Sequence, residues 1–450
     1  MLRIGCGAGF SSDRLEPAVD LAREGDLDWL MFETIGERTM AFGHRDRQAN
    51  PAKGYNPQLV ARLRGVLGHC AARSMTGKRG TRIITNMGVA NVAAAAEVAV
   101  GIARELGLKG LRIAAVEGDD VTAMITPDTR LFDHDDRTCR EVGRPIVGAN
   151  VYLGIDALLP AIEADADVII AGRVADPSLV LAPLVHHYGW DRADWPMLGR
   201  GTLVGHLLEC GMQITGGYFA DPGFKDVPRP ADCGFPIAEV DADGCATITK
   251  LTSAGGLVSV QTVKEQLLYE VHDPKRYLTP DVTADFSSVS LTRSGADRVR
   301  IDGASGTQRP DTLKVTVGFD GGLLGEAGIS YAGVNAGARA RLARDILADR
   351  LGRLTTPRDG MRIDLIGIDS LHATAGIISP VEPHDVRVRV AMRCTDRESI
   401  DTMLWEVESL LCCGPAGGGG YRGQVTPSVI THSALIARDL VKPTCRILVA

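Results

Sequence analysis

The sequence lacks most of the features that mark secreted and membrane proteins. Its ten cysteines include no CxxC pair, so we expect reduced thiols rather than disulfides or a thiol redox site. The N-terminus has no apolar run followed by small residues, and we expect no signal peptide. The most apolar long stretch, residues 89–103, is interrupted by Asn91 and Glu97, whereas a membrane span needs about 20 apolar residues. These absences predict a cytoplasmic protein that does not cross a membrane.

The sequence also has no excess of positive charge. Lys and Arg total 49 against 56 Asp and Glu, giving a net charge of −7, which argues against nucleic acid or an anionic membrane surface as a partner. A local basic pocket remains compatible with this balance. We therefore expect a small anionic molecule as the substrate and a homo-oligomer as the assembly.

What is present is the composition of a folded enzyme-sized chain. Hydrophobic residues make up 45%, charged residues 23% and aromatic residues 5% of 450 residues, which excludes disorder for most of the chain. At about 150 residues per domain the length corresponds to roughly three domains, or two larger ones.

The first half of the chain alternates short apolar runs with helical patterns. The helical patterns cover residues 13–23, 58–71 and 91–106. Short β-branched runs between helices are typical of buried parallel strands. The fold prediction is therefore α/β, a mostly parallel sheet with helices on both faces. Its expected strands are residues 2–4, 27–32, 82–85, 110–116, 146–153 and 168–171.

The pattern changes after residue 220. Residues 222–230 contain three prolines, so we expect a linker or long loop over 221–235. Beyond it, strand patterns come in pairs, each followed by a helical pattern, which predicts an α+β and partly ferredoxin-like second domain. The expected domains are thus residues 1–220 and 236–450. The strand patterns are residues 313–317, 327–331, 362–368 and 386–391, and the helical ones are 335–351 and 397–411.

Polar side chains follow several of the expected strands. Ligands of parallel sheets bind beyond the carboxyl ends of the strands, so we expect one cleft lined by these residues. Acids and glycines also end strands and cap helices, and each loop alone is open to that explanation. The residues expected to line the cleft are Glu33, Asn86, Asp119, Asp120 and Arg173.

The loop after the first strand carries alternating glycines, Gly5, Gly7 and Gly9. Their backbone N–H groups could bind a phosphate or a carboxylate. A dinucleotide site fits less well because Phe10 replaces the last glycine of GxGxxG, although Glu33 could serve as its acid. The alternative is a tight turn before a helix capped by Ser12 or Asp13.

Two acid-bearing loops are candidates for chemistry. Asp119 and Asp120 could hold Mg²⁺ or move a proton, and the alternative is that one of them caps the following helix. Arg173 could grip a carboxylate or phosphate, with Asp176 beside it, and the alternative is an ion pair between these two residues. Asp120 is our first choice for the catalytic base.

A histidine offers a second acid–base candidate. If residues 205–213 are helical, His206 shares one face with Glu209, Cys210 and Gln213. A zinc site is disfavoured because the spacing is not HExxH, and the alternative is a buried, hydrogen-bonded histidine. The chain also contains no GxSxG motif, which disfavours serine-hydrolase chemistry.

A run of four glycines lies near the C-terminus, after a helical pattern. Ordering such a run costs conformational entropy, so it predicts either a flexible lid or a close approach to a ligand, with a simple loop as the alternative. We include Gly417, Gly418 and Arg422 among the substrate-binding candidates.

These segments together resemble the acyclic terpene utilisation (AtuA-like) family. The resemblance implies bacterial breakdown of acyclic terpenes such as citronellol and geraniol through acyl-CoA thioesters, and it runs from about residue 3 to the last strand. It rests on RIGCGAGF (3–10), FETIGERT (32–39), TNMG (85–88), EGDDV (117–121), GRVAD (172–176), SYAG (330–333) and GPAGGGG (414–420).

The expected function is an enzyme that acts on an acyl-CoA or carboxylate metabolite by lyase or hydratase chemistry. Removing a proton next to a thioester needs a carboxylate or histidine base and donors for the enolate oxygen. The catalytic candidates are Asp120, Asp119, Glu33 and His206. The alternative is a non-catalytic subunit that binds a ligand or a partner enzyme, which would show an apolar pocket with few titratable groups.

Overall fold

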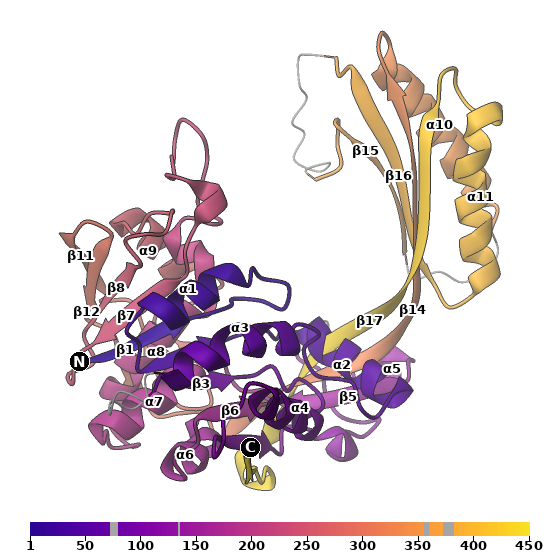
Figure 1. Ribbon diagram of the computed structural model, residues 1–450. Coiled ribbons are helices and arrows are strands. Elements are labelled where there is room, and N and C mark those ends of the chain that lie inside the picture. The colour runs from indigo at the N-terminus through magenta and orange to yellow at the C-terminus, as the bar shows by residue number, and fades with distance from the viewer. Residues whose placement is uncertain (73–79, 134–135, 355–359, 372–381) are drawn as a thin grey trace. The chain divides into compact units, whose positions relative to one another are not determined.

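The computed structural model describes residues 1–72, 80–133, 136–354, 360–371 and 382–450. It divides into two compact units, a first unit of Met1–Gly318 with Thr431–Ala450 and a second unit of Phe319–Ile430. The chain leaves the first unit along strand β14 (Thr312–Ala332) and returns to it along β17 (Gly419–Ala437). Figure 1 shows both strands as long ribbons.

The first unit contains a ten-stranded mixed sheet in the order β11-β12-β8-β7-β1-β2-β3-β6-β4-β18. Its centre, from β1 to β4, is parallel, while the strands on both sides of this centre pair antiparallel. The central strands are β1 (Leu2–Cys6), β2 (Trp29–Phe32), β3 (Arg82–Thr85), β6 (Val168–Ala171) and β4 (Arg112–Glu117). The outer strands are β7 (Pro236–Val240), β8 (Ala246–Lys250), β12 (Arg298–Asp302), β11 (Ser290–Gly295) and β18 (Thr444–Val449).

The predicted α/β class is therefore right, but the predicted mostly parallel sheet is not confirmed. A tight turn at Asp241–Cys245 joins β7 to β8, with Gly244 at a positive φ of 79°. A short turn of this kind returns the chain antiparallel, because a parallel neighbour needs a long crossover. The pairs β7–β8 and β11–β12 thus extend the sheet as antiparallel hairpins.

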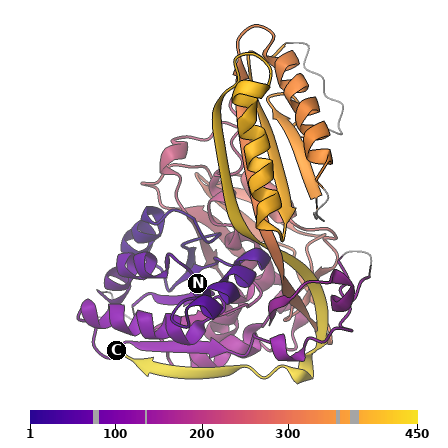
Figure 2. The same ribbon diagram turned by 90° about the vertical axis from the view of Figure 1, so that its right-hand side faces the viewer.

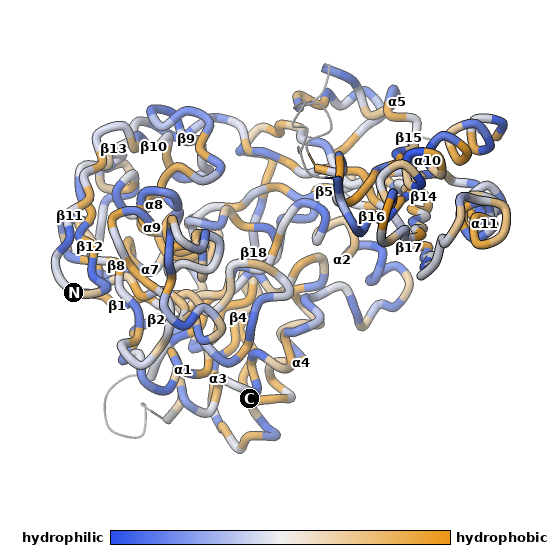
Figure 3. The backbone as a smooth tube through the Cα atoms, turned by 90° about the horizontal axis from the view of Figure 1, so that it is seen from above, coloured by the Kyte–Doolittle hydropathy of each residue, from blue (hydrophilic) through white to orange (hydrophobic). Residues whose placement is uncertain are grey.

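Helices cover both faces of the parallel centre. Its strands are therefore buried along almost all of their length. One helix group packs into a core with Leu30, Phe32, Ile83 and Ile170, and alternate strand residues turn to the other group. Helix α4 is apolar along most of its length, and only Glu97, Arg104 and Glu105 in it are charged; Figure 3 colours the chain by the hydropathy of each residue. The first group is α1 (Glu16–Glu24), α3 (Leu59–Ala72) and α4 (Val92–Glu105), and the second is α6 (Ile155–Glu163), α7 (Ser178–Tyr188) and α8 (Trp195–Glu209).

The strand predicted over residues 146–153 forms, as β5 (Ile146–Val151), but in a different place. It pairs with β14 instead of joining the central sheet, and the Tyr152 N–H donates to the Lys314 carbonyl at 2.9 Å. Helix α2 (Glu37–Ala49) packs against it. The remaining elements of this unit are α5 (Cys139–Val142), α9 (Val260–Leu268), β9 (Tyr277–Leu278), β10 (Thr283–Asp285) and β13 (Ser305–Thr307).

The division between the two units lies at residues 318 and 431 rather than near residue 220. The reason is that β7, directly after the expected linker 221–235, pairs with β1 from Leu2↔Val240 to Gly5↔Ile237. The proline-rich segment is thus a surface loop of the first unit, exposed at Phe224.

The second unit has the β-α-β-β-α-β order of a ferredoxin-like fold. Its strands are arranged as β15-β16-β14-β17, with antiparallel pairing of β14 and β15 to β16. Both helices lie on one face of this sheet (Figures 1 and 2) and share its apolar core. The elements besides β14 and β17 are α10 (Ala336–Gly352), β15 (Gly360–Ile366), β16 (Asp385–Cys394) and α11 (Arg397–Cys413).

The structure joins two predicted strands of this region into one. The segments expected over 313–317 and 327–331 are both parts of β14, which continues through Gly321 and Gly322. Gly322 has a positive φ of 71°, a conformation that glycine adopts without strain. Two separate strands were expected here, whereas the backbone passes through the glycine pair as one strand.

Candidate functional site

A cavity of about 1270 Å³ opens at the carboxyl ends of the central strands, within the first unit. The loops after β1, β2 and β6 supply part of its lining, together with the end of α8 and the start of β14. Its charged lining residues are Asp13, Arg14, Glu33, Glu37, Arg173, Asp176, Glu209, Glu270, Arg276 and Lys314.

Arg173 is the central charge of this cavity. Its side chain is 2% exposed, and its guanidinium group donates to the Ile35 carbonyl at 2.8 Å and to Asp176 Oδ1 at 2.6 Å. The guanidinium carbon lies 4.0 Å from the centre of the Tyr152 ring. Both the ion pair and the ring hold this cation in one orientation.

Glu33 lies beside Arg173 at the end of β2. Its Oε1 accepts the Ile35 N–H at 2.7 Å and the Asn86 side-chain amide at 2.9 Å. Burial raises the pKa of Glu33 well above its ordinary value, and Asp176 adds to the rise while Arg173 opposes it. The environment of Glu33 therefore favours its neutral, protonated form.

Asp176 has a pKa of about 7. Burial is the main cause of the rise, the Arg173 guanidinium opposes it, and the negative charge of Glu209 adds to it. A carboxyl group with a pKa near neutral can both take and give a proton at the pH of a cell. Of the described carboxyl groups in the lining, Asp176 is thus the best suited to general acid–base catalysis.

Glu37, at the start of α2, behaves in the opposite way. Burial would raise its pKa, but Lys314 and the Tyr152 hydroxyl outweigh burial and hold the pKa at about 2. The hydroxyl donates to Glu37 Oε1 at 2.8 Å, and the Lys314 ammonium lies 3.2 Å from the same oxygen. Carboxyl groups with widely separated pKa values in one cavity are typical of acid–base sites.

His206 and Glu209 form a pair on the last turn of α8. His206 is 1% exposed, and its Nδ1 lies 2.9 Å from Glu209 Oε1. Burial opposes charge on the imidazole, but Glu209 outweighs this effect and raises the pKa of His206. Glu209 lines the cavity and His206 does not. The helical face expected over 205–213 thus forms only in part: His206 and Glu209 belong to α8, while Cys210 caps it and Gln213 lies in the 3₁₀ helix Gly211–Thr215.

Two of the other residues expected in the cleft support it from beneath. Asp119 Oδ2 accepts the Arg173 N–H and the Asn150 amide, both at 2.8 Å. Asn86 is fully buried and bonds Glu33 and the Thr34 N–H. Neither side chain lines the cavity, so the strand-end prediction found the right edge of the sheet but not which side chains are accessible.

Asp120 lies outside the cavity as well. Its side chain is 46% exposed, and its Oδ1 accepts the N–H of Thr122 at 3.1 Å and its hydroxyl at 2.7 Å. Asp120 is thus held in a local turn with Thr122, just before the short 3₁₀ helix Thr122–Met124, whose N-cap residue is Val121 and which has no side-chain cap. A ligand in the cavity would not meet our first choice of base.

The glycine loop after β1 is packed closely. The Gly7 N–H donates to the Met31 carbonyl at 2.7 Å, and the Gly9 N–H donates to Asp13 Oδ2 at 2.9 Å. Both donors are therefore occupied, and of Gly5, Gly7 and Gly9 only the last lines the cavity. Anion binding by this loop stays a prediction.

Gly417, Gly418 and Arg422 belong to the second unit. A Cβ at Gly418 would lie 3.1 to 3.2 Å from the side chains of Ile329 and Tyr331, and Gly417 has a positive φ of 74°. The Arg422 guanidinium donates to the Tyr421 carbonyl. These contacts explain the glycines by packing and turn geometry, and their role in substrate binding stays a prediction.

The expected magnesium site finds no further ligands. In the described part of the chain, no three or more His, Cys, Asp or Glu side chains gather as metal ligands would. Asp119 and Asp120 point to different partners, as described above.

The described helices also include none with the length and apolar character of a membrane span.

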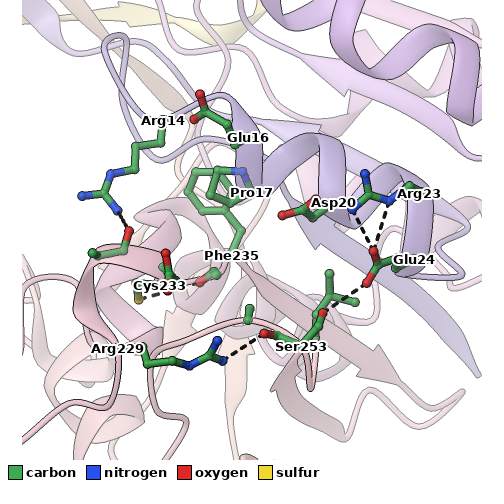
Figure 4. A pocket seen from close by; sticks show the side chains of 15 residues that line it. Arg14, Glu16, Pro17, Asp20, Arg23, Glu24, Arg229, Cys233, Phe235 and Ser253 are labelled. Carbon is green, nitrogen blue, oxygen red and sulfur yellow. Dashed lines mark hydrogen bonds and ion pairs between the residues drawn. The ribbon is translucent and has the colours of Figure 1, made fainter.

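A smaller cavity of about 530 Å³ lies between α1 and the loops at residues 229–235 and 251–254 (Figure 4). Arg14 donates to the Ala231 carbonyl at 2.5 Å and Arg229 to the Ser253 carbonyl at 2.9 Å. Arg23 pairs with neighbouring acids of its own helix. Because its arginines already have protein partners, this cavity offers a weaker binding site than the larger one.

Sequence reasoning missed Glu37, Tyr152, Lys314 and Tyr277 as lining residues. Tyr152 lies within the expected strand 146–153 but directly follows the observed strand β5, which ends at Val151. The strand-end rule could therefore have found it with the correct strand end. Lys314 lies inside a strand, and Tyr277 belongs to a two-residue strand. Nothing in their local sequence points to the cavity.

The comparisons with known proteins give one match. The model of the acyclic terpene utilisation family protein AtuA matches residues 2–447, nearly the whole chain. The searches of curated proteins and of solved structures found no match.

Proposed function

Because the chain belongs to the acyclic terpene utilisation family, we propose that its cavity binds a carboxylate or acyl-CoA metabolite of terpene catabolism. The proposed reaction is acid–base chemistry of the lyase or hydratase type. One observation carries the proposal: two carboxyl groups with raised pKa, Glu33 and Asp176, lie against the buried guanidinium of Arg173. Perturbed carboxyl groups in a cavity are a physical mark of an active site.

The charge of the cavity supports an anionic ligand only if some carboxyl groups are neutral. Six acidic and four basic residues are found among the described lining residues. The pKa values of Glu33, Asp176 and Glu209 are all raised. Six acids and four bases have a formal charge of 4 − 6 = −2, and each of these three groups that is protonated makes the cavity more positive by one.

The proposed roles follow from the two environments. Glu33, as a neutral carboxylic acid, donates a hydrogen bond to the carbonyl oxygen of the substrate and stabilises the enolate. Asp176, as a carboxylate, takes the proton from the carbon next to that carbonyl. In the elimination direction the electron pair of the broken C–H bond forms a C=C bond, and a β-hydroxyl leaves as water with a proton from a second acid. Hydration is the reverse.

The hydrocarbon part of such a substrate also has a matching surface. Large hydrophobic side chains that are exposed to solvent gather in the cavity lining, a feature typical of binding sites. They are Phe10, Phe132, Tyr218, Leu278 and Leu435, which are exposed by 53 to 75%.

Hydrogen–deuterium exchange at the substrate α-carbon tests the proposal without knowledge of the final product. The protein is incubated in D₂O with branched acyl-CoAs and their free acids, saturated and 3-hydroxylated, and deuterium uptake is followed by mass spectrometry. We expect catalysed uptake, and Asp176→Asn should slow it by about 10²-fold or more. Asp128→Asn, which changes an exposed acid outside the lining, is the matched control.

The same experiment separates the alternative function. A non-catalytic ligand-binding subunit would bind one of these compounds, seen as a rise in its melting temperature, and would catalyse no exchange and no dehydration. The ten charged residues of the lining favour the enzyme. Asp120→Asn is the informative comparison, because loss of exchange in that variant would return the base to our original choice.

A further inference from the structure

One carboxyl oxygen of Glu209 has no hydrogen-bond partner among the described residues. Oε1 is bonded to His206, while Oε2 is buried and has no hydrogen-bond partner among the residues that the structure describes. A buried carboxylate oxygen without a partner costs free energy, and in a native structure it calls for an explanation. Glu209 also lines the large cavity, so a ligand there could supply the missing partner.

The hydrogen bonds of His206 define how many protons the pair holds. His206 Nε2 lies 3.3 Å from the Leu267 carbonyl, and a carbonyl only accepts, so Nε2 carries a hydrogen. Nδ1 faces Glu209 Oε1 at 2.9 Å. One proton therefore lies between these two atoms, on the imidazole or on the carboxyl group, and in both cases Oε2 is the free end of the pair.

The surroundings hold the imidazole in place. Its ring centre lies 5.3 Å from that of Tyr277 and 5.7 Å from that of Phe286, stacked on the latter. The Gln266 side chain donates to the His206 carbonyl at 3.1 Å. Such an enclosed ring can act on the cavity only through Glu209.

We propose that Glu209 is a second proton-transferring residue of the cavity, with Oε2 as the reacting atom and His206 as the positioning residue behind it. The inference rests on the proposed function. In the elimination described above, Glu209 carries a second proton, on Oε2, besides the one shared with His206. It gives this proton to the leaving β-hydroxyl: the Oε2–H bond breaks, the bond from hydrogen to the hydroxyl oxygen forms, and water departs. The resulting carboxylate is stabilised by the hydrogen bond to His206. In hydration it takes a proton from the attacking water.

The charged and titratable groups facing Glu209 belong to several elements. Glu270 and Asp176 repel its negative charge, Arg173 attracts it, and Tyr277 lies on the same side. Asp176 and Glu209 thus act as a pair across one cavity, each affecting the proton of the other.

Two measurements test this inference separately from the proposed function. The first is ¹⁵N NMR of histidine-labelled protein, with the His206 signals assigned from their absence in His206→Gln. We expect Glu209→Gln to change the Nδ1 shift and to lower the pH at which His206 titrates. Identical His206 titration in the wild-type protein and Glu209→Gln would overturn the pair.

The second measurement is dehydration of the 3-hydroxyacyl compound as a function of pH. We expect Glu209→Gln to lower turnover by about 10²-fold or more while α-deuterium exchange, assigned to Asp176, falls much less. His206→Gln should shift the pH profile with a smaller loss, and the double variant should be no slower than Glu209→Gln. Glu209→Asp, which keeps the charge but shortens the side chain, guards against a folding defect and should retain part of the activity.

The outcomes are distinguishable. Normal dehydration in Glu209→Gln overturns the role of Glu209 and leaves Asp176 in place. Absence of exchange and dehydration in the wild-type protein overturns the proposed function and the catalytic role of Glu209 with it, even where NMR finds the pair. Equal loss of exchange and dehydration in Glu209→Gln also overturns the division of roles.

Discussion

Replacing Gly7 by alanine distinguishes a packing role of the first glycine loop from a role in anion binding. A Cβ at Gly7 would lie 2.4 Å from Phe32 Cε1 and 2.9 Å from two further atoms of the same ring. Non-bonded carbon atoms are at their best separation near 3.5 to 4.0 Å, so one side must move by roughly 1 Å or more. Phe32 is completely buried, which leaves its ring little room.

The expected cost follows from this crowding. Extra atoms in a well-packed core typically destabilise by about 1–3 kcal/mol. The Gly7 N–H also donates to the Met31 carbonyl at 2.7 Å, so a backbone shift that relieves the contact would stretch this hydrogen bond. We expect Gly7→Ala to fall in the upper half of that range, about 2–3 kcal/mol.

Urea unfolding followed by circular dichroism measures this difference as a shift of the midpoint. Gly68→Ala is the matched control, because Gly68 lies in α3 and a Cβ there meets nothing within 4 Å. Alanine is the better helix former, so the control should gain about 0.5–1 kcal/mol. Gly7→Ala should therefore lower the free energy of unfolding, and Gly68→Ala should raise it.

One result would refute the packing argument. If Gly7→Ala unfolds at the wild-type midpoint and yet loses affinity for acyl-CoA or free carboxylates, the loop binds an anion through its backbone, as the glycine pattern predicted. A loss of stability with unchanged affinity of the folded protein would leave Gly7 as a packing residue.

Three further predictions concern individual charges. Asp119→Ala should destabilise by about 2 kcal/mol or more and raise KM, because it leaves two buried donors without an acceptor, one of them the Arg173 N–H; unchanged denaturation and kinetics would contradict this. Asp281 has a pKa raised to about 6 by burial, so the wild-type protein should lose about 3 kcal/mol relative to Asp281→Asn as pH rises from about 4 to 7. A pH-independent difference between their unfolding free energies would show that this pKa is not raised. Lys314→Met should raise the pKa of Glu37 above its present value of about 2, measured by ¹³C NMR of the carboxyl carbon, and an unchanged pKa would show that Tyr152 alone holds the charge.

The sequence predicted the buried strands of the first unit better than their neighbours. The runs 82–85 and 168–171 coincide with β3 and β6, because continuous apolar, β-branched segments have few alternatives to a buried strand. The sequence did not predict which strands pair with one another. β18 joins β4 from the far end of the chain, and nothing within the last residues specifies which sheet edge they meet.

The prediction of the second unit came from the alternation of strand and helix patterns along the sequence. Both helices and the strands β15 and β16 were expected close to their observed places, and α11 has a clear start signal in Asp396, which accepts the N–H of Ser399. Strand β14 was expected as two strands, and β17 was not predicted. Its boundaries were not recognisable, since each boundary lies within a strand, in β14 and in β17. A domain boundary inside a strand leaves no proline-rich linker to find.

The candidate site gives the clearest account of what strand-end reasoning can and cannot do. It predicts which loops meet at one edge, and Glu33 and Arg173 are indeed at the cavity. It does not predict which neighbouring side chain faces the solvent, as the adjacent acids Asp119 and Asp120 demonstrate. Asp119 turns inward because a backbone N–H and an amide meet it there, and Asp120 turns to the next hydroxyl along the chain.

The properties of the acid–base groups depend on contacts with residues distant in sequence. Asp176 owes its pKa to burial and to the opposing charges of Arg173 and Glu209, and the last of these lies on a helix more than thirty residues further on. Glu209 in turn differs from an ordinary buried acid because His206 occupies one oxygen and leaves the other toward the cavity. In this protein the pKa of a carboxyl group depends on the groups that bury it and on those that form hydrogen bonds to it. These groups come from elements that only the fold brings together.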